Sequence, residues 1–142
     1  MDTIFTKIID GQIPARFLWK DEHCVVFLSI APLSQGHALV VPRVEVDHWL
    51  DVDPDLAAHL MKVSQIIGQA QNTVWQPKRV GQMIQGFEVP HCHIHVWPTN
   101  SIDEFDFDKV DQNPDPDLMD RSAANIREQL VAAGHGEFVP ES

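Results

Sequence analysis

The chain has 142 residues, enough for one domain, and its 44% apolar and 22% charged residues are typical of a globular protein. The formal net charge of −11 argues against a protein that binds duplex DNA or RNA, because phosphate contacts need clusters of lysine and arginine that this sequence lacks. A pocket for one nucleotide remains compatible with this charge, since histidines and backbone N–H groups can hold a single phosphate.

The first part of the chain predicts short elements. Residues 3–9 are expected to form a helix. Residues 15–21 and 24–30 predict a β-hairpin around the turn at Asp21-Glu22. Residues 37–42 predict a third strand that is covered on both faces, because it is almost wholly apolar.

A long amphipathic helix is predicted next. Asp53 fits the N-cap and Pro54 the first helical position, and the apolar pattern continues to Trp75. Residues 79–85 and 91–97 predict two more strands. The order of elements indicates an α+β fold, an antiparallel sheet with the long helix packed on one face. The apolar stripe of that helix consists of Leu56, Leu60, Val63, Ile67 and Val74.

The last part of the chain differs in composition. We divide the chain into a domain of residues 1–100 and an acidic extension of residues 101–142 that packs on the same domain. Phe105 and Phe107 alternate with acidic residues, and could anchor the extension over the core, over a pocket or over a partner subunit. Residues 117–133 predict a terminal helix. Its expected buried positions are Leu118, Ile126, Leu130 and Ala133.

Membrane and secretion signals are not apparent in the sequence. No run of about 18 apolar residues is present, so we expect no transmembrane helix. The N-terminal stretch lacks the basic segment and cleavage site of a signal peptide. Cys24 and Cys92 are too few for a disulfide framework and lie in apolar runs. We therefore expect a cytoplasmic protein with reduced, buried cysteines.

The stretch PHCHIHVW, residues 90–97, places His91, His93 and His95 at alternate positions. In a strand these three side chains share one face, opposite the apolar residues between them. A protein core accepts imidazoles only when each has a hydrogen-bond partner. Three interpretations are open: hydrogen-bonded structural histidines, a metal site, or attack by one imidazole on phosphorus while its neighbours stabilise charge.

Charge repulsion favours the third interpretation. Imidazoles about 6.7 Å apart on a strand, if both charged, repel by about 2.5 kcal/mol at an effective dielectric constant near 20. Because an unperturbed histidine titrates near pH 6.5, at least one imidazole stays neutral at about pH 7. A neutral His93 could then act as a nucleophile, while a flanking imidazolium stabilises the phosphate. No metal is needed for this chemistry.

Residues 91–97 resemble the signature of the histidine triad (HIT) family, His-x-His-x-His followed by apolar residues. Residues 2–16, 24–32 and 35–43 are similar to successive segments of the bacterial Hint-like branch, so the resemblance covers roughly residues 2–100. It implies a HIT-like fold and a homodimer with a sheet that continues across both subunits.

The resemblance also implies an activity. HIT proteins hydrolyse or transfer nucleoside monophosphates from phosphoramidates or dinucleoside polyphosphates, without a cofactor. His93 would attack the α-phosphorus and form a nucleotidyl-histidine intermediate, with His91 orienting it through its backbone carbonyl and helping to bind phosphate. His95 and His37 would complete the network on the phosphate side. The expected ligand is a purine nucleotide or a nucleotide conjugate.

Several further residues are candidates for substrate binding or for the core. The candidates for substrate binding are Phe27, Ser29, Ile30, Gln85 and Glu88. Ile4, Phe17 and Phe27 could form the wall of a base pocket, but we favour the core for all three. The other histidines are expected to be solvated, namely His23, His48, His59 and His135.

Three departures from the family pattern affect the expected site. Thr3, Thr6 and Glu45 stand where many bacterial relatives have three of four zinc ligands, so we predict no structural zinc. Ser29 replaces an acidic residue that holds ribose, and its hydroxyl makes a weaker hydrogen bond than a carboxylate does.

The third departure lies just before the triad. Phe87-Glu88 replaces a Gln-Ser pair that contacts the phosphate and leaving group in the Hint branch. Glu88 could face solvent, which we favour, or donate a proton, or repel the phosphate. The alternative function is therefore a HIT-fold dimer that binds or senses a nucleotide but scarcely turns it over.

Overall fold

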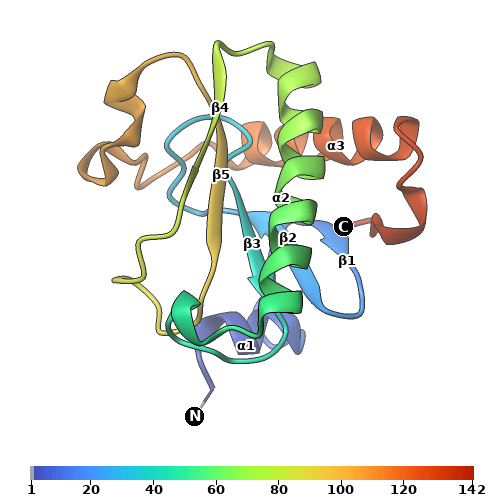
Figure 1. Ribbon diagram of the computed structural model, residues 1–142. Coiled ribbons are helices and arrows are strands. Elements are labelled where there is room, and N and C mark those ends of the chain that lie inside the picture. Colours follow the sequence, from blue (N-terminus) through green and yellow to red (C-terminus); the bar gives the residue numbers. More distant parts are fainter. Residues whose placement is uncertain (1) are drawn as a thin grey trace.

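The computed structural model describes residues 2–142 as an antiparallel sheet with three α-helices around it (Figure 1). In chain order the helices and strands are α1 (Ile4–Ile9), β1 (Phe17–Lys20), β2 (Cys24–Leu28), β3 (Ala38–Pro42), α2 (Pro54–Trp75), β4 (Arg79–Met83), β5 (Ile94–Thr99) and α3 (Pro116–Ala132). Within these residues the strand order is β1-β2-β3-β5-β4, and each pairing of neighbours is antiparallel. The α+β layout predicted from the sequence is confirmed.

The long helix α2 has the predicted bounds because its two ends are capped. The side chain of Asp53 accepts hydrogen bonds from two backbone N–H groups of the first turn, and Pro54 occupies the first helical position. Gln76 ends the helix in a left-handed conformation, with φ of 48°. The helix packs against β3, β5 and α3 and covers one face of the sheet (Figure 1). Among residues 2–142 no helix is both long and apolar enough to cross a membrane.

Strand residues alternate between two apolar clusters, one on each face of the sheet. On the α2 face, Cys24 and Val26 join side chains of α2 and α3. On the α1 face, Val25 and Phe27 pack with Phe5. The expectation that Phe17 and Phe27 belong to the core is confirmed, but the same expectation for Ile4 is wrong, because that side chain is 45% exposed.

The last strand of the sheet starts later than the sequence predicted. β5 begins at Ile94, so His91 and His93 lie in an extended segment before it and only His95 lies in the strand. Pairing with β3 stops here because Pro42 has no N–H to donate, and the N–H of Cys92 bonds to Val46 instead. The alternation of faces nevertheless persists, since Cys92, Ile94 and Val96 all join the α2-side cluster.

The C-terminal residues pack on the same sheet. Helix α3 lies against α2 and β1, within one residue of the predicted bounds at each end (Figure 1). Ile126 and Leu130 are fully buried, as predicted. Ala133 is exposed, so its predicted burial is wrong: it caps the helix, where the chain turns towards solvent.

Candidate active site

His91 is fully buried and fixed at both ring nitrogens. Its Nε2 lies 2.8 Å from the carbonyl oxygen of Pro42, which only accepts hydrogen bonds, so Nε2 carries the proton. Its Nδ1 therefore accepts from the hydroxyl of Thr3, also at 2.8 Å. Both ring nitrogens are thus hydrogen-bonded inside the protein, so the expectation that His91 helps to bind phosphate is wrong for this side chain.

His93 is held by the backbone of His91. Its Nδ1 lies 2.8 Å from the carbonyl oxygen of His91, so Nδ1 is the protonated nitrogen and the lone pair lies on Nε2. The ring of Phe5 also contacts the imidazole in a T-shaped arrangement, with the two centroids 4.8 Å apart. The side chain is thereby fixed in the tautomer that a nucleophile needs.

His37 and His95 share a buried hydrogen bond whose direction is set by the backbone. The N–H of Leu33 donates to Nδ1 of His37 at 2.9 Å, so a neutral His37 carries its proton on Nε2. That proton is donated to Nδ1 of His95 at 2.9 Å, which leaves the proton of His95 on Nε2. This buried Nε2 has no hydrogen-bond partner among residues 2–142. The pair thus presents one N–H donor to a ligand.

The four residues form what we call the histidine cluster: His37, His91, His93 and His95. Burial lowers the pKa of His37 to about 3, with a smaller contribution from His93. Burial likewise lowers the pKa of His95 to about 3, helped by His37 and His93. The pKa of His93 is also lowered, chiefly by burial, although the carbonyl of His91 and the charge of Glu88 oppose this.

These pKa shifts bear on the charge expected from the sequence. His93 is neutral near pH 7, as a nucleophile requires. The expected flanking imidazolium is wrong for the protein without ligand, because His95 and His37 are neutral as well. A phosphate therefore first meets neutral N–H donors.

A cavity of about 370 Å³ lies beside His95. Three predicted substrate-binding residues line it: Ser29, Gln85 and Glu88. The other two do not, because Phe27 packs in the α1-side cluster and the side chain of Ile30 is 77% exposed. The cavity falls in the range of roughly 300–1,000 Å³ that is common for small-molecule sites.

The position of Glu88 agrees with two of the three alternatives left open by the sequence: exposure to solvent, and a carboxylate close enough to the cavity to repel a phosphate. Its side chain is exposed, yet it lines the cavity. Gln85 holds it in place: the amide of Gln85 donates to the Glu88 carboxylate and accepts from the backbone N–H of Phe87. Phe87 is 93% exposed and contributes nothing to the cavity lining.

The acidic extension supplies part of the site. Phe107 and His95 form a T-shaped ring contact with centroids 4.8 Å apart, and Phe105 packs on Trp97 at the same distance. Phe107 therefore anchors the acidic extension over the pocket, and Phe105 anchors it over the core, which are two of the three positions considered from the sequence. Asp108, Val110 and Gln112 also line the cavity, and none of the three was predicted from the sequence as a site residue. Their only signal in the sequence was the alternation of phenylalanine with acidic residues.

The comparisons with known proteins agree with this geometry. The HIT domain profile matches residues 10–102. The chain belongs to the HIT family. A HIT-like protein from Methanocaldococcus jannaschii is 33% identical over 105 residues, which span 67% of this chain and 77% of that protein. An adenosine 5′-monophosphoramidase from Schizosaccharomyces pombe is 34% identical over 102 residues, spanning 69% of this chain and 74% of the enzyme. The HIT family therefore includes hydrolases that act on nucleotide derivatives.

A solved HIT structure extends the likeness to nearly the whole chain. It is a zinc-bound histidine triad family protein from Mycobacterium smegmatis, with a TM-score of 0.80 and 27% identity over 96% of this chain and 98% of that one. The triad neighbourhood of this chain does not suit zinc. The hydroxyl of Thr3 bonds to His91, while the backbone N–H of Thr3 and the hydroxyl of Thr6 both donate to Glu45. Threonine hydroxyls are not among the usual ligands of zinc, so hydrogen bonds connect these positions instead.

Proposed function

We propose that this HIT protein is a nucleotide hydrolase or nucleotidyl transferase that cleaves at the α-phosphate through a covalent intermediate on His93. The observation that carries the proposal is the hydrogen bond from Nδ1 of His93 to the carbonyl of His91, which leaves a lone pair on Nε2 of a neutral imidazole. The neighbouring His95, with its ring centroid 4.9 Å away, offers an N–H donor without a protein acceptor among residues 2–142.

The reaction follows from these two nitrogens. Nε2 of His93 attacks the α-phosphorus, the bond to the leaving group breaks, and the leaving group takes a proton from solvent. The Nε2–H of His95 donates to a phosphoryl oxygen as charge develops there, and His37 keeps that N–H oriented. Water then attacks the nucleotidyl-histidine and gives its proton to solvent, the bond from phosphorus to Nε2 breaks, and the nucleoside monophosphate leaves the restored imidazole.

The substrate is a purine nucleotide conjugate, such as a nucleoside phosphoramidate or a dinucleoside polyphosphate. The S. pombe relative, an adenosine 5′-monophosphoramidase, supports the first of these. Ser29 lines the cavity, and its oxygen accepts from the N–H of Ala31 at 3.2 Å, so the hydroxyl proton stays available for a ligand. Gln85 reduces the repulsion between Glu88 and a phosphate by donating to its carboxylate.

A trapping experiment tests this function. The protein is mixed with adenosine 5′-phosphoramidate, quenched in the pre-steady state and digested, and the peptide that contains residues 91–97 is analysed by mass spectrometry. We expect AMP on His93, no adduct in His93→Ala, and an unchanged adduct in His48→Ala, which removes an exposed histidine elsewhere. AMP release without an adduct on this peptide would contradict the covalent route.

A nucleotide-binding protein with little turnover is the second candidate. Glu88 favours it, because a carboxylate at the cavity lowers the affinity for an anionic transition state. In that case AMP would bind measurably, and turnover of the phosphoramidate would be no faster than in His93→Ala. Glu88→Gln separates the two candidates, since it removes the charge and should raise turnover only if the chemistry at His93 is intact.

We further propose that the protein is a homodimer whose sheet continues across the subunits, and that residues 101–142 belong to the same folded unit as residues 1–100. The likeness to the HIT family supports the dimer. Light scattering coupled to size-exclusion chromatography gives the mass directly, and a mass equal to one chain at micromolar concentration would contradict it.

A further inference from the structure

A second polar cluster lies at the turn between β1 and β2, on the α2 face of the sheet. Asp21 and Cys24 flank the turn, and His59 reaches it from α2. One potential ligand atom from each lies within 4.8 Å of the other two. We call these three residues the hairpin cluster. The prediction that His59 is solvated is wrong: its side chain is 29% exposed, and its Nε2 lies 2.7 Å from Asp21.

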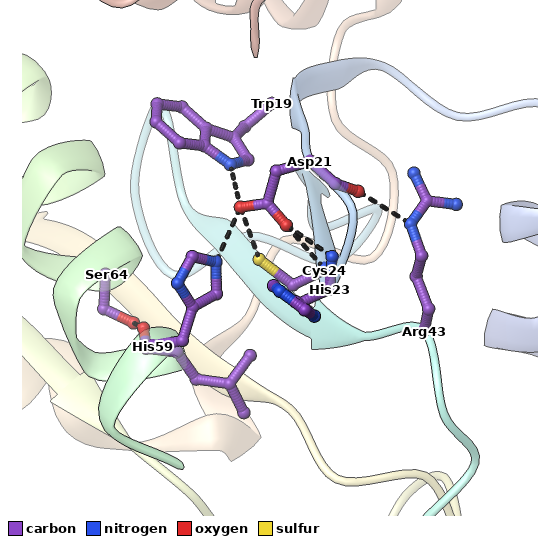
Figure 2. A network of polar contacts seen from close by, with 8 residues as sticks. Trp19, Asp21, His23, Cys24, Arg43, His59 and Ser64 are labelled. Carbon is purple, nitrogen blue, oxygen red and sulfur yellow. Dashed lines mark hydrogen bonds and ion pairs between the residues drawn. The ribbon is translucent and has the colours of Figure 1, made fainter. Parts of the chain in front are cut away.

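Asp21 is the centre of this cluster (Figure 2). Its side chain is only 7% exposed. One carboxylate oxygen, Oδ1, accepts from the backbone N–H groups of His23 and Cys24 at 2.7 and 2.8 Å. The other, Oδ2, accepts from Trp19 Nε1 at 2.8 Å, from the Cys24 thiol at 3.5 Å and from His59. Figure 2 shows these last three groups converging on one oxygen from different directions.

We propose that the hairpin cluster binds a zinc ion through Oδ2 of Asp21, Sγ of Cys24 and Nε2 of His59, with water as the fourth ligand. Carboxylate, thiolate and imidazole are the three side-chain ligands that zinc uses. At bond lengths of about 2.0–2.3 Å, tetrahedral ligands stand about 3.3–3.8 Å apart, so atoms within 4.8 Å need only small shifts. The sum of Zn²⁺, one carboxylate and one thiolate is neutral, which suits a buried place.

The hydrogen bonds of Asp21 are compatible with zinc binding, in which two hydrogen-bond donors to the carboxylate become ligands of the ion. Two of its five donors are the groups that would coordinate the ion, Cys24 S–H and His59 N–H. On binding, the S–H bond breaks, a bond from sulfur to zinc forms and the proton leaves to solvent. Nε2 of His59 also gives up the proton that it donates to Asp21, so that its lone pair binds zinc and the proton of the neutral ring lies on Nδ1. The remaining donors, Trp19 Nε1 and two backbone N–H groups, still orient the carboxylate, as outer-shell partners do in zinc sites.

The site also has a route for the ion. A cavity of about 310 Å³ is lined by Asp21, His23 and His59, with Lys62 and His135 at its walls. This opening gives the ion and its water ligand access to the carboxylate and the imidazole. A bound ion would connect the β1–β2 turn to α2, two elements joined here by the hydrogen bond between His59 and Asp21. Its role is therefore structural, on the face of the sheet opposite His93.

Cobalt is the probe for this site, because a thiolate ligand gives Co²⁺ a near-ultraviolet charge-transfer band that oxygen and nitrogen ligands do not. The full-length protein is stripped with chelator, dialysed and titrated with Co²⁺ and then with Zn²⁺. We expect one Co²⁺ per chain with the thiolate band, and displacement of the Co²⁺ by Zn²⁺. Cys24→Ser should lose the band, and His59→Gln should lose stoichiometric binding.

Matched variants test whether a loss of Co²⁺ binding comes from unfolding, and whether Co²⁺ binds at other histidines. Cys92→Ser makes the same change at the other buried cysteine and should keep the band, as should His48→Gln at an exposed histidine. Trp19→Phe keeps the ring but removes the donor to Asp21, and should weaken binding by about 10- to 100-fold. Circular dichroism shows whether each variant is folded. No stoichiometric uptake, or uptake that Cys24→Ser leaves intact and His93→Ala abolishes, would overturn the proposal.

Discussion

In the histidine cluster, on one face of the sheet, burial removes charge and hydrogen bonds to the backbone or to a neighbouring histidine fix the tautomers. In the hairpin cluster, on the other face, a carboxylate keeps its charge and accepts hydrogen bonds from five donors. Burial alone would raise the pKa of Asp21, but the hydrogen bonds from Trp19, His23, His59 and Cys24 hold it below its usual range. The two clusters differ in the hydrogen-bonding groups that remain available to a ligand. The histidine cluster keeps one lone pair and one N–H for a ligand, while the carboxylate of Asp21 has all its donors inside the protein.

The largest expected effect concerns the lone pair of His93. His93→Ala should reduce turnover of adenosine 5′-phosphoramidate by about four orders of magnitude or more, because the nucleophile itself is removed. The change in stability should be small by comparison, since the side chain donates only one hydrogen bond, to the carbonyl of His91. Steady-state kinetics and urea unfolding on the same preparation check both parts. If His93→Ala keeps a tenth of the activity, the lone pair on Nε2 of His93 is not the nucleophile.

The second prediction concerns acid stability, where the two clusters respond in different pH windows. His37 and His95 titrate near pH 6.5 when unfolded and at about pH 3 when folded, so only the unfolded chain takes up their protons in between. Their contribution is complete above about pH 6.5 and is lost as the pH falls towards 3. Asp21 has a lowered pKa, so its contribution is present above about pH 4 and is lost only below that.

Urea unfolding at several pH values measures the first window. Between about pH 6.5 and 5 the free energy of unfolding should fall by roughly 1–3 kcal/mol per pH unit, with one or two protons bound on unfolding. In His95→Gln this slope should be smaller, because one of the two groups is gone. Equal slopes in the two proteins over this range would mean that these histidines are not the groups that titrate.

The third prediction addresses the hairpin cluster through its charge. Asp21→Asn preserves the shape of the side chain but replaces one acceptor oxygen with an N–H₂ group that faces donors. We expect a loss of about 2–4 kcal/mol in the free energy of unfolding, because a buried network loses its charge-assisted hydrogen bonds. Glu22→Gln is the control on the same turn; its side chain is exposed, and the change should stay within about 0.5 kcal/mol.

These two clusters differed in how well the sequence predicted them. The histidine cluster was found because three of its members share a short motif and His37 belongs to a neighbouring segment similar to the HIT family. The hairpin cluster was missed because His59 lies 38 residues from Asp21 in the chain. No local pattern connects a turn residue to a residue on a helix, so only the packing of α2 on the sheet brings them together.

The fold shows the same division between local and distant information. Asp53 and Pro54 predicted the start of α2 because capping is a local property. The start of β5 was wrong because it depends on Pro42, which lies about 50 residues earlier and cannot donate to the ladder. Asp108 and Gln112 were not predicted as site residues for a similar reason: their place at the cavity depends on how Phe107 packs on His95.

The smallest expected effect concerns the outermost bond of the histidine cluster. Thr3→Val keeps the shape of the side chain but removes the hydroxyl that donates to His91 and caps α1. Because Pro42 still accepts from His91, we expect only a roughly tenfold loss in kcat with little change in KM. The lost cap should also reduce the free energy of unfolding by about 1 kcal/mol.

Thr3→Ser restores the hydroxyl and is the matched control. It should recover most of both losses, since the donor to His91 and the acceptor at the helix N-terminus return together. If Thr3→Val loses stability but keeps its full kcat, the hydroxyl serves only as a cap. In that case Pro42 alone would be enough to position His91 and, through its carbonyl, His93.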